Sequence, residues 1–353
     1  MIKNKILLLL VSTIALSCGN HYTMEDFKTA EKIDAHFHVY TSESAAMEQA
    51  QKDNFKLLVL NTNSKSCEHV VETQQWLQKL DKSYTNKFAY STTFCVDGWD
   101  EPGWTQNTID WLDQCLNDGA NSVKVWKNIG MKLRNKEGKL VMIDDPQFDV
   151  VFAHLAKKQI PVVAHMGEPK NCWLPLNEMT TKNDSSYYAR QAQYHMFKHP
   201  EMPSYNEQMS ARDHMLDKNP TLVFIGCHLA SLEWSVDTLS EWLDKYPNAA
   251  VDLSGRMGQL FYQTCENREK VRTFFIDYQD RILYGTDIID GGKNNENLFS
   301  QMHETWLRDW EYFCTKNKMT SDLIVGEFRG LQLPKDVVDK VFSKNARMWY
   351  GSF

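Results

Sequence analysis

The sequence predicts an α/β fold, a (β/α)8 or TIM barrel, for three reasons. Short apolar, β-rich runs alternate with longer amphipathic runs, and eight such pairs follow one another. The short runs are continuously apolar, as strands are when helices bury both faces of a parallel sheet. The chain has 353 residues, which is long for an ordinary domain but common for a single barrel.

The expected elements can be justified in chain order. We expect strands at 33–38 (IDAHFH), 56–61 (KLLVLN), 88–94 (FAYSTTF), 121–126 (NSVKVW), 160–165 (IPVVAH), 221–228 (TLVFIGCH), 248–254 (NAAVDLS) and 281–286 (RILYGT). We expect helices at 44–53, 67–80, 105–118, 146–158, 207–219, 233–246, 266–277, 298–315 and 335–349. Asp145 before Pro146 is a typical helix start, and Pro247 ends the helix before the seventh strand.

The domain organisation follows from these elements. One barrel domain is expected at 32–353, after a short tether at 19–31. No internal repeat or low-complexity linker interrupts it. A long irregular segment, 167–204, follows the fifth strand, and a loop of this length in a compact domain is usually a lid or binding loop.

The first 18 residues have the pattern of an export signal. Lys3 and Lys5 precede an apolar run that is too short to span a bilayer. Cys18 follows the run and resembles the cysteine of a bacterial lipobox, which is lipidated. We expect an exported lipoprotein on the periplasmic side of the cell envelope, held to the membrane only through Cys18. A plain signal peptide or an uncleaved anchor is the alternative.

The composition limits the classes of molecule that the protein is expected to bind. The net charge of −7 provides no basic field for nucleic acid, so a small-molecule substrate is expected, and a homodimer stays open. Seven cysteines besides Cys18 are scattered without CxxC spacing, which is neither a disulfide framework nor a zinc ribbon. We interpret most of them as buried apolar residues, with a single disulfide left open.

Polar side chains at the ends of the predicted strands indicate a catalytic metal site. Barrel active sites lie at the carboxyl ends of the strands. His36 and His38 end the first strand, His165 the fifth, His228 the sixth, and Asp287 follows the eighth. His36 and His38 are two residues apart and share one face of a strand. Imidazoles and a carboxylate suit Zn²⁺, and a catalytic zinc lowers the pKa of bound water to about 7.

These motifs resemble the amidohydrolase superfamily, in its amidohydrolase-2 branch with the aminocarboxymuconate-semialdehyde decarboxylases. The matching stretches run in family order from DAHFH through VKVWKNIG, VVAHMGEP, FIGCHLAS, YPNAAVDLSGRM and YQDRILYGTD to NARMWY. The resemblance implies His36, His38, His165 and Asp287 as metal ligands. It also implies a catalytic His228, and Asp287 can accept the proton of the attacking water as well. One Zn²⁺ per chain is expected, with another divalent ion as the alternative.

Three further residues are candidates for substrate binding. Lys124, on the fourth strand, could face substrate, bridge two metals as a carboxylated lysine, or be a core-edge lysine. Arg256, just past the seventh strand, could grip a substrate carboxylate with two hydrogen bonds. Trp173, in the long segment, could form a pocket wall.

The leading functional hypothesis is a hydrolase in which a metal-activated water attacks an acyl C–N or C–O bond of an amide, lactone or ester. The first alternative is a metal-dependent non-oxidative decarboxylase. The second, from another class, is a catalytically silent surface binding protein; a complete set of ligand residues argues against it.

Overall fold

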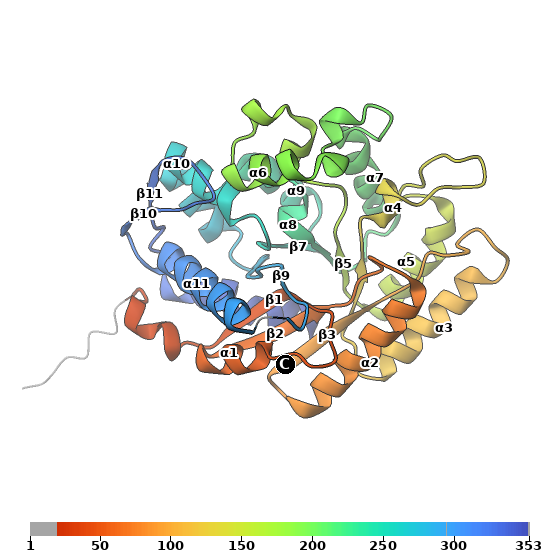
Figure 1. Cartoon of the computed structure of the whole chain (residues 1–353), viewed down its shortest axis with the longest axis horizontal. Helices are drawn as coiled ribbons and strands as arrows, with labels where there is room; N and C mark the ends of the chain where they lie inside the picture. The colour runs from red at the N-terminus through yellow and green to blue at the C-terminus, as the bar shows by residue number, and fades with distance from the viewer. Residues whose placement is uncertain (1–19, 294, 352–353) are drawn as a thin grey trace, which may run out of the picture.

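Nine parallel strands form one curled sheet in the computed structural model, which describes residues 20–293 and 295–351. Their order is β8-β7-β6-β5-β4-β3-β2-β1-β9. The strands are β1 (Lys32–Val39), β2 (Phe55–Leu60), β3 (Phe88–Thr93), β4 (Ser122–Val125), β5 (Val162–Ala164), β6 (Phe224–Gly226), β7 (Ala249–Asp252), β8 (Ile282–Leu283) and β9 (Ile288–Asp290). The predicted TIM-barrel fold is confirmed (Figure 1).

The predicted eighth strand, 281–286, is observed as β8, and a further strand that was not predicted, β9, completes the closure of the barrel. β8 pairs with β7, whereas β9 pairs with β1. Between them, the N–H of Ala35 donates to the carbonyl of Tyr284 (2.9 Å), and the N–H of Asp287 donates to the carbonyl of His36 (2.8 Å). A Cβ at Gly285 would lie 2.8 Å from that of His36, so only glycine lets the strands approach this closely.

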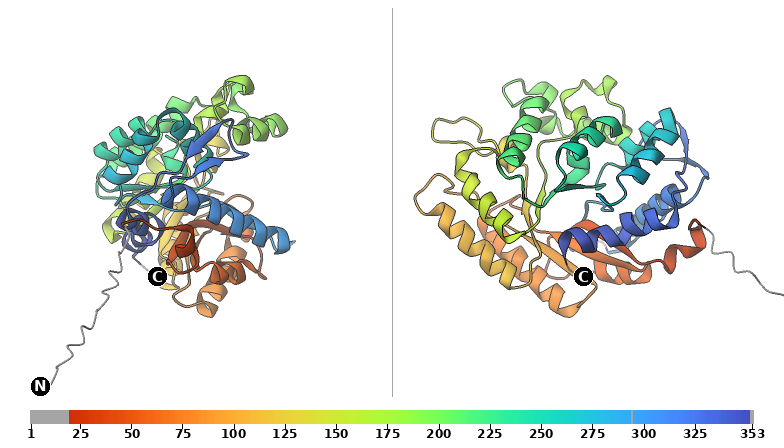
Figure 2. Two further views of the ribbon diagram at one scale, coloured as in Figure 1. Left: turned by 90° about the vertical axis from the view of Figure 1, so that its left-hand side faces the viewer. Right: turned by 180° about the vertical axis from the view of Figure 1, so that it is seen from behind.

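Helices lie outside the sheet, as the views in Figures 1 and 2 show. The long ones are α2 (Cys67–Ser83), α3 (Trp104–Asn117), α5 (Pro146–Lys158), α7 (Tyr205–Lys218), α9 (Val236–Lys245), α10 (Met257–Asp277) and α11 (Asn295–Cys314). Short ones are α1 (Ala46–Lys52), α4 (Asn128–Met131), α6 (Lys182–Arg190) and α8 (Cys227–Ala230), and the described chain ends with α12 (Lys335–Asp339), a π-helical turn (Lys340–Lys344) and α13 (Asn345–Tyr350).

α10 begins nine residues earlier than the predicted helix at 266–277. The backbone is non-helical at Asn267, whose side chain accepts from the N–H of Lys270 at 3.0 Å. Asn267 therefore caps the second half of the element, and the predicted helix at 266–277 begins beside this internal start. The first half forms because Met257, Leu260 and Phe261 are buried against the core.

The barrel interior is filled by small and branched side chains. Ile33, Leu58, Val163, Ile225 and Leu283 belong to one cluster that contains residues from most of the strands. A much larger cluster lies between the sheet and the helices. The strands are therefore buried on both faces, which explains their continuous apolar pattern.

Residues 20–31, expected as a tether, are folded against the barrel. Thr23 and Asp26 form a capping box on the 3-10 helix Met24–Lys28, and Phe27 is buried against Trp310 of α11. The predicted signal segment 1–18, with Cys18, lies outside the described residues. Among the residues that are described, no helix has the length and apolar character needed to cross a membrane.

The segment 167–204 is more ordered than expected for an irregular loop. It contains α6 and four 3-10 turns, and its own small core includes Cys172, Tyr188 and Met196. In Figure 1 it lies at the top of the view, in yellow-green to green, away from α2 and α3.

One disulfide, Cys67–Cys95, joins the start of α2 to the segment after β3, with a Cα–Cα distance of 5.3 Å. Of the remaining described cysteines, Cys115, Cys172, Cys227 and Cys314 are buried and Cys265 is exposed. The interpretation of most cysteines as buried apolar residues is consistent with this distribution.

Candidate metal centre

The two histidines of β1 point together into the mouth of the barrel. A register shift between Asp34 and Phe37 places one extra residue on β1 relative to β2. Ile33 and Ala35 face the interior, and beyond this bulge His36 and His38 do so, with ring centroids 5.1 Å apart. Bulges commonly re-aim side chains beside active sites. The Nε2 atoms of His36 and His38 lie 3.5 and 3.1 Å from Oδ1 of Asp287.

Hydrogen bonds fix how the β1 rings are oriented. Nδ1 of His38 lies 2.9 Å from the carbonyl oxygen of Leu60, which can only accept, so Nδ1 carries the proton. Nδ1 of His36 lies 2.7 Å from Oδ2 of Asp252. In this arrangement both Nε2 atoms present a lone pair toward Asp287, as metal-binding histidines do. Nε2 of His36 is buried and has no hydrogen-bond partner among the described residues.

His165 and His228 form a second, connected pair. Nδ1 of His228 lies 2.8 Å from the carbonyl oxygen of Ser254 and therefore donates. Nε2 of His228 must then accept, and Nδ1 of His165 lies 3.1 Å from it. His165 consequently donates through Nδ1 and keeps a lone pair on Nε2, which is buried and has no partner within the described chain.

The backbone brings His228 to this position by an unusual turn. Residues His228, Leu229, Ala230 and Ser231 all have positive φ, between 54° and 59°. Ile225 and Cys227 face the barrel interior, so strand alternation would point His228 outward toward the helices. The left-handed turn reverses this, and the ring lies 5.0 Å from that of His36 and 4.2 Å from that of His165.

Burial keeps the imidazoles of His36, His165 and His228 neutral. Burial lowers the pKa of His36, and it lowers the pKa values of His165 and His228 well below the usual range. Burial alone would raise the pKa of Asp287, but its interactions with His38 and the neighbouring histidines outweigh that effect and hold the pKa well below its usual range. Neutral imidazole and ionised carboxylate are the forms that bind metal.

These residues fit a divalent metal ion. One nitrogen from each of His36 and His38 and one oxygen of Asp287 lie within 4.8 Å of one another. The lone pair on Nε2 of His36 is available to a metal ion, because this atom has no hydrogen-bond partner among the described residues. A second group, His36 with Cys227 and Asp252, fits less well, because burial raises the pKa of the Cys227 thiol and Asp252 occupies Nδ1 of His36. His165 belongs to neither group. It is next to the first group because it contacts His228, whose ring lies beside that of His36.

A cavity of about 660 Å³ opens over the centre. Its lining includes His38, His165 and Asp287 of the centre, together with Lys124 and Arg256. Nζ of Lys124 donates to Sγ of Cys227 at 2.7 Å. Arg256 donates to the carbonyl of Gly255 (2.9 Å), while its buried Nε has no partner among the described residues.

Trp173 takes a different place from the one expected. It is not among the residues that line the cavity. Its indole N–H donates to the carbonyl of Pro203 (3.1 Å), and its ring packs on Tyr205 with centroids 5.6 Å apart. Trp173 therefore packs against the end of its own segment and the start of α7. The order of this segment has no local signal in the sequence, so this position could not be predicted.

Sequence reasoning missed Asp252 and Ser254. Asp252 accepts from the N–H of His228 (2.8 Å) as well as from His36. Oγ of Ser254 lies 2.8 Å from Nδ1 of His36 and 3.0 Å from Nδ1 of His228. Both residues end the predicted seventh strand, so the strand-end criterion applied to histidines could have found them. A further pair, Lys127 with Glu168, forms a largely buried ion pair at the cavity wall.

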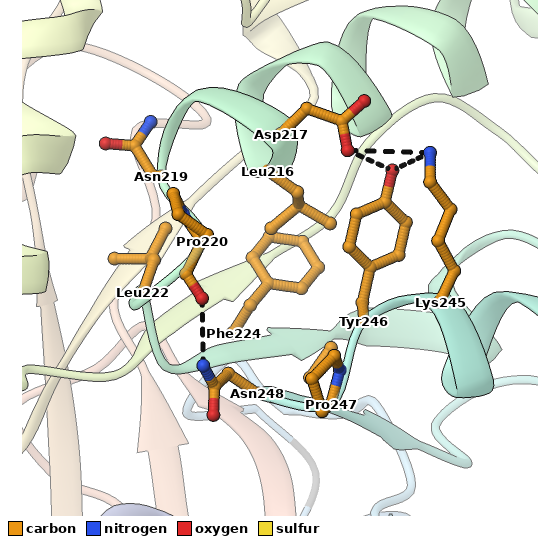
Figure 3. Close-up of a pocket in the computed structure, with 11 residues that line it drawn as sticks. Leu216, Asp217, Asn219, Pro220, Leu222, Phe224, Lys245, Tyr246, Pro247 and Asn248 are labelled. Atoms are coloured by element: carbon orange, nitrogen blue, oxygen red, sulfur yellow. Dashed lines mark hydrogen bonds and ion pairs between the residues drawn. The ribbon is translucent and has the colours of Figure 1, made fainter.

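Another pocket lies at the opposite end of the barrel (Figure 3). It includes Phe224 and Ala249, the first residues of β6 and β7, and its volume is about 230 Å³. Asp217 and Lys245 approach within 3.5 Å there, and Asn248 donates to the carbonyl of Pro220 at 2.8 Å. The histidines lie at the other strand ends, so this pocket has no part in their chemistry.

Comparisons with known proteins agree with this geometry. The family model described as Amidohydrolase matches residues 33–352. Among solved structures, 2,6-dihydroxybenzoate decarboxylase from Rhizobium is 15% identical, with a TM-score of 0.53, over 91% of this chain and 99% of that chain. A protein of Staphylococcus aureus provisionally named an amidohydrolase is 12% identical, with a TM-score of 0.52, over 91% and 99%.

A third structure, provisionally named a 2-pyrone-4,6-dicarboxylic acid hydrolase, comes from Pseudomonas putida. It is 11% identical, with a TM-score of 0.50, over 91% of this chain and 98% of that chain. At these identities the structures show the shared fold, and no curated protein matches the chain at a significant level. Because the family model spans almost all of the barrel, the chain belongs to the amidohydrolase family and is an enzyme of amidohydrolase type.

Proposed function

We propose that this enzyme is a zinc-dependent hydrolase that cleaves an acyl C–N or C–O bond in a small substrate bearing a carboxylate. The observation that carries the proposal is the convergence of His36, His38 and Asp287 beneath a cavity of about 660 Å³. His165 would complete the ligand set through its free Nε2. A divalent ion held there supplies Lewis-acid polarisation of a carbonyl and lowers the pKa of water.

The chain's own residues supply the remaining chemistry. The side chain of Asp287 is 37% exposed and lines the cavity, so it can accept a proton from an attacking water. His228, with Nδ1 donating to Ser254, would take up or return a proton near the leaving group through Nε2, the atom that accepts from Nδ1 of His165 in this structure. Arg256 offers a guanidinium for a substrate carboxylate, and Lys124 adds a second positive charge to the wall.

The test is metal content per chain. A protein starting at Asn20 should retain about one zinc after purification, and His36→Ala should lose it. His214→Ala is the matched control, because that exposed histidine lies on α7 beside Asp144. Folded wild-type protein that holds no metal after reconstitution would contradict the proposal. About two ions per chain would point instead to Lys124 as a carboxylated bridge.

Decarboxylation is the alternative, because the same residues could return a proton to carbon after loss of CO₂. The similar structure of 2,6-dihydroxybenzoate decarboxylase motivates this comparison. Carbon-13 NMR of the metal-loaded enzyme with carboxylated lactones, amides and hydroxybenzoates separates the two reactions. Hydrolysis produces a new carboxylate and an alcohol or amine, whereas decarboxylation produces labelled bicarbonate.

We further propose that the enzyme is exported and anchored through a lipid on Cys18. The apolar run before Cys18 supports this, as does the Cys67–Cys95 disulfide, since disulfides persist in oxidising compartments. Labelled palmitate should be incorporated into the full chain in bacterial cells, and Cys18→Ser should abolish the labelling. Equal labelling of both proteins would refute the anchor.

A further inference from the structure

A second cavity adjoins the one above the metal centre. Its volume is about 480 Å³, and we call it the side chamber. Its apolar and aromatic lining consists of Trp126, Met131, Tyr187, Tyr194, Met196 and Met202. Trp126, Lys127, Glu168 and Tyr187 also line the metal cavity, so the two spaces share a wall.

The side chamber is built by the segment that follows β5. One side comes from the chain after β4, including Met131 of α4. The other side comes from residues 187–202, whose 3-10 turns hold Tyr194 and Met196. Met131, Tyr194 and Met202 pack against a small core that fixes these turns. The chamber is therefore a formed space, and an ordered segment maintains its far wall.

Most of the exposed surface of the wall is apolar and aromatic, and the polar side chains of Asn128, Lys132, Gln193, His199 and Glu201 line the remainder together with Lys127 and Glu168. Three methionines and the rings of Trp126, Tyr187 and Tyr194 surround the space. Methionine side chains adapt to irregular apolar shapes and make favourable contacts with aromatic rings. Typical small-molecule sites are apolar and span about 300–1,000 Å³. The dimensions and lining thus suit an aryl or branched alkyl group.

The charged groups at the shared wall are already paired. Lys127 bonds Glu168, and their side chains are only 19% and 6% exposed. Nζ of Lys127 also lies 5.9 Å from the ring centroid of Tyr194 and 6.0 Å from that of Trp126. Because this pair is neutral overall, it does not compete for a substrate carboxylate. Arg256, whose Nε has no partner among the described residues, is on the metal side of the wall and absent from the chamber lining.

We propose that the side chamber binds the apolar, preferably aromatic, arm of a two-part substrate whose carboxylate-bearing acyl end lies in the metal cavity. This inference rests on the proposed function for the acyl end. It assigns substrate selectivity to the segment 167–204 together with the chain after β4, and names Met202, Met131 and Trp126 as specificity-determining residues. An N-arylalkyl monoamide of a dicarboxylic acid, whose acyl end carries the carboxylate, has this combination of groups.

Binding measurements test the inference without requiring turnover. Acetate, butyrate, 4-phenylbutyrate and 4-phenylbutanol are titrated by calorimetry into the metal-loaded full chain in detergent. We expect 4-phenylbutyrate to bind at least tenfold tighter than butyrate. Met202→Trp, which fills the chamber, should remove this gain while leaving the affinity for acetate and the metal content unchanged. Met348→Trp, on an exposed methionine of α13, is the matched control and should keep the gain.

The probes distinguish failure of the inference from failure of the proposed function. 4-Phenylbutanol lacks a carboxylate, so its affinity reports binding in the side chamber alone. Arg256→Met should therefore weaken the binding of 4-phenylbutyrate but not that of 4-phenylbutanol. Equal affinities for butyrate and 4-phenylbutyrate in wild type, or an undiminished gain in Met202→Trp, would overturn the inference even if the enzyme hydrolyses other substrates. Chamber binding that persists in a protein without turnover would support the inference and count against the proposed reaction.

Discussion

Asp252 connects the two histidine pairs through a single carboxylate. It accepts from His36 through one oxygen and from the backbone of His228 through the other. Burial alone would raise its pKa, but the electrostatic interaction and the hydrogen bond with His36 outweigh that effect and hold the pKa well below the usual range. An ionised Asp252 therefore keeps the proton of His36 on Nδ1, and this fixes Nε2 as the atom available to metal.

Asp252→Asn tests this role at the residue scale. The amide is nearly isosteric but cannot act as a charged acceptor, so metal affinity should fall about 10- to 100-fold. Competition with a calibrated zinc chelator measures the change. Asp237→Asn, at an exposed ion pair on α9, is the control. Equal zinc affinities in both variants would show that Asp252 does not orient His36.

Glu233 is a second informative carboxyl group. It is 1% exposed, and one oxygen accepts from the N–H of Lys170 (2.8 Å) while Oε2 has no partner among the described residues. Burial raises its pKa from 4.5 to about 7, and Arg256 offsets only part of that effect. The folded protein thus holds this proton at a pH where the unfolded chain has released it.

The sign of the resulting pH dependence follows from proton linkage. Between pH 4.5 and about 7 the native state binds more protons at Glu233, so stability falls as pH rises through this window. The loss is on the order of 3 kcal/mol, at 1.36 kcal/mol per pKa unit. Glu233→Gln should remove this component and be more stable than wild type at pH 8, as measured by urea unfolding. Glu241→Gln, on the exposed face of α9, should keep the wild-type slope.

At the scale of elements, the left-handed turn 228–231 carries the most backbone strain. Non-glycine residues rarely adopt positive φ, and four in succession need support from their surroundings. The hydroxyl of Tyr205 donates to the carbonyl of Ser231 at 2.5 Å, and Arg212 donates to the carbonyl of Ala230. Gly226 allows the turn to fold back onto β6, because a Cβ there would lie 2.5 Å from that of Ala230.

Gly226→Ala should therefore displace His228 without removing the metal ligands. We expect kcat to fall by about 100-fold or more, the usual contribution of a positioned acid–base group, with metal content unchanged. Gly291→Ala is the control, since a Cβ there meets nothing within 4 Å. Circular dichroism confirms folding of both variants. Wild-type kcat in Gly226→Ala would show that the turn does not determine the position of His228.

At the scale of the whole molecule, the disulfide joins two neighbouring βα units. Cys67 and Cys95 are 28 residues apart, and closing a loop of that size stabilises a chain by roughly 3–4 kcal/mol in the loop-entropy model. Reduction, or the double change Cys67→Ser and Cys95→Ser, should lower the apparent Tm by several degrees in calorimetry. Cys265→Ser, at the exposed free cysteine, should not change it. An unaltered Tm in the double variant would exclude a stabilising disulfide.

Much of this molecule could be predicted from the sequence because its signals are local. Apolar run length and helix caps located all eight predicted strand regions and most of the helices. The position of polar residues at strand ends then identified His36, His38, His165, His228 and Asp287, because parallel strands all end at the same face. The start of α10 was misplaced because it depends on tertiary burial, whereas Asn267 gives a local capping signal.

Only the tertiary structure decided how these residues meet. A bulge in β1 and a left-handed turn after β6 set the directions of three histidines, and neither feature has a sequence signature of its own. The proton positions depend on acceptors such as the carbonyls of Leu60 and Ser254, which come from other strands. The sequence by itself determined the fold class and the chemical types at the barrel mouth. Long-range packing decided their orientation, the pairing of the additional strand β9 with β1 and the side chamber, because these arise from contacts between segments far apart in the chain.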